Sequence, residues 1–162
     1  MPVSDADFNS TLAITDNVNN LAADPIKNNG VFQGAVVTLL GTIRTKVNSL
    51  NAKLDADGGV TDTNYASTWN LAALDANQIS QGGLNQPALY TRLALIVTNW
   101  AGILTKLDND TGVTDTNYNS LGAVSLNATV KGTGIGQKDL VQFLDSFITK
   151  FNATLTKLDA DA

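Results

Sequence analysis

The sequence predicts an all-α fold, a helical bundle made of three tandem repeats. The first observation behind this is a string at residues 52–67 that returns almost unchanged at 105–120. Its back half opens the chain at 3–10, and its front half closes the chain at 156–161. The second is a helical spacing of apolar residues in three long segments. The third is that no stretch alternates apolar and polar residues in the sustained way that indicates a strand.

A recurring string of this kind indicates a repeat architecture. The chain has 162 residues, which is the length of one ordinary domain. We therefore interpret 1–162 as a single domain with repeat units at about 1–57, 58–110 and 111–162, a period of about 50 residues.

Each unit begins with a pattern typical of a helix N-terminus. In the first unit, Ser4 at the N-cap and Asp7 three residues later would form a capping box, with Val3 and Phe8 as a hydrophobic staple. The same frame fits the corresponding residues of the other units, which are Val60, Thr61 and Tyr65, and Val113, Thr114 and Tyr118. Short helices are expected at about 5–22, 62–76 and 115–121, followed by connectors rich in Gly, Pro and Asn.

A long helix is expected at the end of each unit. Its apolar residues are separated by 4, 3, 4, 3 and 4 positions, which is typical of helices packed at a shallow crossing angle. The positions are Val36, Leu40, Ile43, Val47, Leu50 and Leu54; Leu89, Leu93, Ile96, Trp100, Ile103 and Leu107; and Leu140, Leu144, Phe147, Phe151, Thr154 and Leu158. Only Thr154 interrupts the pattern, and Leu155 can cover for it. Gly58 or Gly59, and Gly112, are expected to end the helices in the left-handed conformation.

Two arrangements of these units are possible. The long helices can lie parallel around a pseudo-threefold axis, with the shorter ones returning between them, or the units can form a linear stack of helical hairpins. We favour the closed bundle because the end units resemble the middle one, whereas a stack needs distinct caps.

Composition excludes several functions. The chain contains no histidine and no cysteine, so a Ser-His-Asp or Cys-His nucleophile cannot be assembled. We expect no enzymatic activity, no catalytic residues and no cofactor. The net charge of −5 disfavours nucleic acid as a partner, because phosphate binding needs a cationic surface. No apolar run is long enough for a membrane span.

Acidic residues cluster where the units meet, and they suggest two alternatives. One is a hard cation with oxygen ligands, since Asp-x-Asp before a glycine is similar to the opening of a calcium loop, although its later ligands are missing. The other is that the carboxylates are solvated or cap nearby backbone amides. The candidates are Asp55, Asp57, Asp62, Asp108, Asp110 and Asp115. We favour the second alternative and assign no metal site.

Aromatic and basic residues also recur. Trp100 lies in the apolar series and is expected in the core. The candidates for a surface that contacts a partner are Phe8, Tyr65, Trp69 and Tyr118. Phe8, Tyr65 and Tyr118 could instead act only as hydrophobic staples. Lys53, Lys106 and Lys157 lie in the last helical turns, where they favour the helix dipole and could pair with neighbouring aspartates.

The string Lys-Leu-Asp-Ala-Asp-Gly-Gly-Val-Thr-Asp-Thr-Asn-Tyr resembles repeats in small virion proteins of tailed bacteriophages. The resemblance covers about a third of the chain, and it implies a virion localisation and a structural role, as a capsid decoration protein or as a neck or tail component. We therefore expect a non-enzymatic protein that binds other virion proteins in many copies. The alternative is a small binding module whose connector loops contact a ligand, a glycan or a host surface.

Overall fold

The computed structural model describes residues 2–15, 29–69, 79–80, 83–84, 86–126 and 137–162. This part of the chain is helical, which confirms the predicted all-α class. The long helices are α3 (Asn29–Ala56), α4 (Gln86–Asn109) and α6 (Gln137–Ala160). The short ones are α1 (Phe8–Leu12), the 3-10 helix η1 (Ala66–Thr68) and α5 (Tyr118–Gly122).

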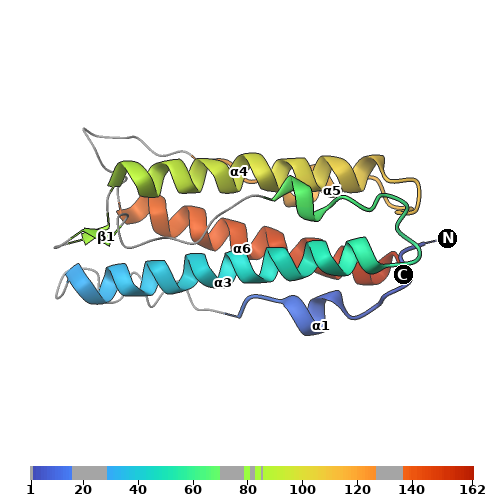
Figure 1. The fold of residues 1–162 in the computed structure, drawn as a ribbon, viewed down its shortest axis with the longest axis horizontal. Coiled ribbons are helices and arrows are strands. Elements are labelled where there is room, and N and C mark those ends of the chain that lie inside the picture. Colours follow the sequence, from blue (N-terminus) through green and yellow to red (C-terminus); the bar gives the residue numbers. More distant parts are fainter. Residues whose placement is uncertain (1, 16–28, 70–78, 81–82, 85, 127–136) are drawn as a thin grey trace.

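The three long helices extend along the molecule in the same direction (Figure 1). Both termini lie at the end where these helices finish (Figure 1), which we call the junction end. Each short element packs against two long helices: α1 against α6 and α3, η1 against α3 and α4, and α5 against α4 and α6. Segments that are far apart in sequence therefore meet along the sides of the bundle.

The core follows the predicted apolar series. Every one of its positions is buried, including Thr154, whose hydroxyl donates to the carbonyl of Lys150 at 2.9 Å. Trp100 packs against Phe147 and Phe151, with ring centroids 5.6 and 5.5 Å apart. Its indole N–H donates to the carbonyl of Gly122 at 2.9 Å, so the polar atom of this buried ring is satisfied.

The predicted short helices are too long. Helix α1 covers 8–12 rather than 5–22, and only the single turn η1 lies in the described part of 62–76. Residues 16–22 and 70–76 of these predictions lie outside the described residues. Helix α5 begins at Tyr118 rather than at 115. The residues before each short helix do not begin it, because their backbone amides bind carboxylates from distant parts of the chain.

The predicted capping box is wrong for the same reason. Asp7, not Ser4, is the N-cap of α1, and no side chain at that position makes a cap hydrogen bond. Ser4 instead donates its amide and its hydroxyl to Asp57. Val3 and Phe8 are both fully buried, but they belong to the common core rather than to a local staple.

The glycines after the long helices have a different role from the predicted one. None of Gly58, Gly59 and Gly112 has a φ in the left-handed range. A Cβ at Gly59 would lie 1.9 Å from the carbonyl oxygen of Pro2, and one at Gly112 would lie 1.9 Å from that of Gly59. These two glycines therefore allow one backbone to approach another closely.

Within the connector before α4, β1 (Ile79–Ser80) pairs antiparallel with β2 (Gly83–Leu84). In the described ranges, no helix combines the length and apolarity needed to cross a membrane.

Candidate functional site

The candidate site is the set of polar contacts at the junction end. Each long helix finishes with the same motif, Lys-Leu-Asp-x-Asp, at 53–57, 106–110 and 157–161. In each motif the lysine, the leucine and the first aspartate lie in the last turn of the helix, and the second aspartate directly follows its last residue.

The first aspartate of each motif binds the start of a short helix. Asp55 accepts the amides of Tyr65 and Ala66 at 2.7 and 3.1 Å. Asp108 accepts those of Tyr118 and Asn119 at 2.7 and 3.0 Å.

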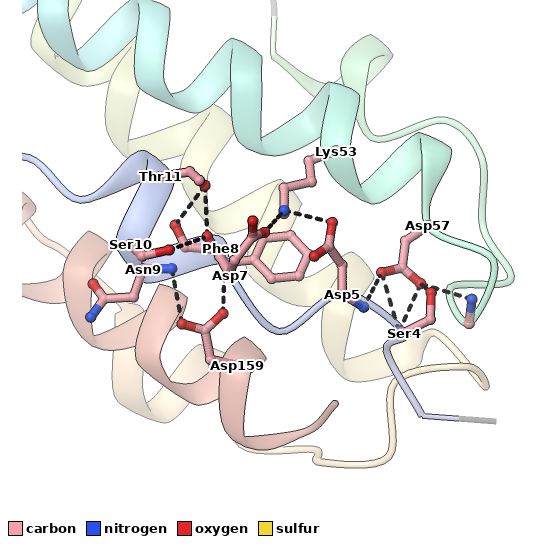
Figure 2. A network of polar contacts seen from close by, with 11 residues as sticks. Ser4, Asp5, Asp7, Phe8, Asn9, Ser10, Thr11, Lys53, Asp57 and Asp159 are labelled. Carbon is pink, nitrogen blue, oxygen red and sulfur yellow. Dashed lines mark hydrogen bonds and ion pairs between the residues drawn. The ribbon is translucent and has the colours of Figure 1, made fainter.

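Asp159 makes the same pair of contacts with the other end of the chain. It accepts the amides of Phe8 and Asn9 at 2.6 and 3.0 Å (Figure 2). Helix N-termini leave such amides unpaired and favour negative charge. These carboxylates therefore replace local N-caps with caps supplied by another helix.

The second aspartate binds the non-helical residues before a short helix. Asp57 accepts the amides of Ser4, Asp5 and Gly59, and the hydroxyl of Ser4, at 2.7–2.9 Å (Figure 2).

Asp110, which directly follows α4, has the corresponding donors. They are the amides of Thr61, Asp62 and Gly112 and the hydroxyl of Thr61, at 2.6–3.0 Å. Asp161 accepts the amide of Thr114 at 3.0 Å. The second aspartate thus connects each segment to the long helix that follows it in the sequence.

These hydrogen bonds change the acidity of the carboxyl groups. Burial raises the pKa of Asp57 and of Asp110, but the hydrogen bonds donated to each carboxylate outweigh burial and hold both pKa values below the ordinary one. Burial, with the charge of Asp110 beside it, raises the pKa of Tyr65. The tyrosine therefore stays protonated and donates its hydroxyl to Asp110 at 3.0 Å.

The lysine of each motif forms an ion pair and lies over an aromatic ring. Lys53 pairs with Asp5 and Asp7, and its ammonium nitrogen is 4.7 Å from the centroid of Phe8 (Figure 2). Burial lowers the pKa of Lys53, but the two carboxylates outweigh it and raise the net value.

The other two lysines repeat the arrangement. Lys106 pairs with Asp62 at 3.0 Å and lies 4.9 Å from the ring of Tyr65. Lys157 pairs with Asp115 and lies 5.0 Å from the ring of Tyr118. All three lysine side chains are mostly buried, so these cation–π contacts are shielded from water and are stronger than exposed ones.

The cation alternative has no support from these contacts. The partners found for Asp55, Asp57, Asp108 and Asp110 are N–H and hydroxyl donors, while Asp62 and Asp115 pair with lysines. In the ranges that the structure describes, no group of three or more potential ligands is placed to hold a metal ion. The negative charge at the helix ends is offset by amide and ammonium groups.

The predicted partner-contact residues are not on the surface of this chain. Phe8, Tyr65 and Tyr118 are fully buried, and Trp69 is 5% exposed. The expectation that they face a partner is therefore wrong for the isolated chain. The rings of Phe8, Tyr65 and Tyr118 lie beneath the three lysines, and Trp69 belongs to the core.

Three residues that bind the short segments are not among the predicted candidates. Two of them are Asp159 and Asp161, although the recurrence of Asp-x-Asp at 55–57, 108–110 and 159–161 indicates them. Asn152 accepts the amide of Ile14 and donates to its carbonyl, both at 2.9 Å, and no sequence pattern indicated this pair.

A pocket lies elsewhere, beside the start of α6. Ser125, Asp139, Gln142, Phe143 and Ser146 line it. It offers one carboxylate and two hydroxyl groups. The junction end is the candidate site because its carboxylates bind backbone amides and lysine ammonium groups at the ends of all three long helices.

Comparison with known proteins adds no relative. A scan against protein-family models, a search of curated proteins and a search of solved structures each found no match to this chain.

Proposed function

We propose that this protein is a non-enzymatic virion structural protein, a capsid decoration protein that binds other virion subunits in many copies. The observation that carries the proposal is the threefold recurrence of one junction within one chain. A short segment is bound between two long helices by one aspartate from each helix and by a lysine. The resemblance of the same motifs to repeats of phage virion proteins supports this assignment.

We further propose that three tandem structural units stand around a pseudo-threefold axis. The cyclic order of the contacts supports this. Asp55 binds the segment of the second unit, Asp108 that of the third, and Asp159 that of the first. The common direction of the long helices in Figure 1 supports it as well. With such symmetry, one chain could meet three equivalent capsid subunits at a quasi-threefold position of an icosahedral shell.

The outer sides of the long helices are the proposed contact surface. Thr45, Thr98 and Thr149 occupy the same register in the three helices, and all are exposed. α4 carries no charged residue between Arg92 and Lys106. A surface of neutral, short side chains repels a neighbouring subunit little and permits close packing.

The test is co-sedimentation with intact phage particles. We expect the chain to sediment with them, and a Thr45→Lys/Thr98→Lys/Thr149→Lys variant, folded by circular dichroism, to bind at least about tenfold more weakly, a loss of ~1.4 kcal/mol. The matched control is Thr42→Lys, a single charge on a half-buried flank of α3. A chain absent from purified virions, and unable to bind them, would refute the proposal.

The same experiment separates the alternatives. A copy number comparable to that of the capsid subunit supports decoration, whereas a small fixed number per particle indicates a neck or tail component. Binding to a glycan array or to host envelope, without binding to particles, would instead indicate a binding module.

A further inference from the structure

The N-terminal segment, residues 2–15, is bound to the bundle as a peptide ligand would be. Its amides at Phe8 and Asn9 bind Asp159, which is 151 and 150 positions away in the sequence. Its amides at Ser4 and Asp5 bind Asp57, 53 and 52 positions away. None of these contacts depends on the covalent connection between the segment and α3.

The receiving residues form a defined site, which we call the α3–α6 seat. It consists of Lys46, Lys53 and Asp57 from the α3 side and Asn152 and Asp159 from α6. Asn152 binds both backbone groups of Ile14, and Lys46 donates to the carbonyl of Thr11 at 3.1 Å. The seat therefore forms hydrogen bonds with backbone groups at several points along the segment.

Specificity comes from the side chains of the segment. Val3, Phe8, Leu12 and Ile14 are all buried, and Phe8 lies beneath the ammonium group of Lys53. Asp5 and Asp7 complete the match by pairing with that lysine. A ligand of this seat is therefore an acidic peptide with apolar residues in this order.

We propose that the α3–α6 seat is a peptide-binding site that also accepts the N-terminal segment of a second copy of this chain. A second copy carries the same ligand, so the contacts within one chain can form between two chains at no cost in contact energy. Exchange of an identical element is a low-cost route to oligomers. Within one chain the segment has a high effective concentration, so exchange requires a crowded assembly or a weakened segment.

The first test uses a labelled peptide of residues 2–15 and a full-length Phe8→Ala chain. This substitution weakens the chain's own segment and leaves the seat intact. We expect the peptide to bind the variant at least about tenfold more tightly than it binds wild type, whose seat is occupied. A peptide that itself carries Phe8→Ala should not bind.

Two controls locate the binding. Adding Asp159→Asn to the Phe8→Ala chain should abolish peptide binding, whereas adding Asp108→Asn, the matched change at a different junction, should not. If Phe8→Ala does not fold, Ser4→Pro removes the amide that binds Asp57 without opening a cavity. A folded variant without saturable binding, or binding that survives Asp159→Asn, would overturn the proposal.

The second test identifies a second copy as the partner. The Phe8→Ala chain has a defective N-terminal segment and an intact seat. The Asp159→Asn chain has an intact N-terminal segment and a defective seat. Mixed at high concentration, they should form a heterodimer detectable by analytical ultracentrifugation, while each chain alone should remain monomeric. Failure to associate would contradict the exchange. Both tests stand independently of any role in a virion.

Discussion

Asp110 shows how much of this fold depends on single side chains. It is 6% exposed and accepts hydrogen bonds from backbone amides and hydroxyls on two segments. A buried charge is stable only when it is fully hydrogen-bonded, so losing its charge leaves several donors poorly paired.

Asp110→Asn should therefore lower the stability at pH 7 by about 1–3 kcal/mol. Because the pKa of Asp110 is lowered in the folded state, its contribution is fully present above the ordinary carboxyl value of about 3.9 and is lost as the pH falls through the folded value. Thermal unfolding between pH 7 and pH 3 should show a steeper fall for wild type than for the variant. Parallel pH curves would show that this carboxylate is not stabilised by its donors.

Substitutions at two glycines test whether the backbone at Gly112 lies against the backbone at Gly59. Gly112→Ala would force a Cβ against the carbonyl of Gly59, and we expect a loss of about 1–3 kcal/mol, as for overpacking. Gly58→Ala meets nothing within 4 Å and should be neutral or stabilising by up to about 1 kcal/mol, because it restricts the unfolded chain. Urea denaturation of both variants gives the comparison. Equal effects would mean that the two backbones do not lie in contact.

At the scale of elements, the long helices could be predicted from sequence, whereas the bounds of the short ones could not. Every residue of the predicted apolar series is buried, because a spacing of 3.5 residues places all of them on one face of a helix. The start of each short helix is instead set by Asp55, Asp108 or Asp159, which lie 10 to 151 residues away. A local capping rule cannot include such partners, so it favoured Ser4.

The candidate site could be predicted only in part, because the partners of its aspartates are distant in the sequence. The recurring aspartates identified the junction, and amide capping was one of the alternatives considered for them. Which amides they bind depends on the three-dimensional order of the helices. The sequence does not predict that Phe8, Tyr65 and Tyr118 are buried beneath the lysines, because this position follows from packing and not from spacing.

Hydrogen exchange can test the remote capping of α5. Asp108→Ala should speed exchange of the Tyr118 and Asn119 amides by about fivefold, since loss of a cap costs ~1 kcal/mol. The amides in the middle of α4 should keep their wild-type protection. Asp145→Ala, an exposed site on α6 with the same change of charge, is the control. Unchanged exchange at both amides would exclude the cap.

At the scale of the whole molecule, the proposed threefold arrangement would be a ring in which α6 and α1 are joined by hydrogen bonds and not by the chain. In the repeat register, Ala162 corresponds to Thr111, and Pro2 corresponds to Gly112. Joining Ala162 directly to Pro2 would therefore reproduce the connection that the chain already makes between its second and third units.

This correspondence predicts the behaviour of a circular permutant. A chain that starts at Gly59, runs through the new bond and ends at Gly58 should fold with the wild-type circular dichroism spectrum. Its melting temperature should lie within ~8 °C of wild type, a difference of about 1–2 kcal/mol. The control is a circular permutant whose new termini lie within α4, between Trp100 and Ala101. It should lose cooperative unfolding because the break interrupts a core helix.

The closed arrangement of three equivalent units is tested most directly by a crystal structure of the protein. We predict that the three units superpose by successive rotations of roughly 120° about one axis, and that Asp159 binds Phe8 and Asn9 as Asp55 and Asp108 bind their own segments. Units related by translation, or an Asp159 carboxylate distant from the N-terminal segment, would contradict the account.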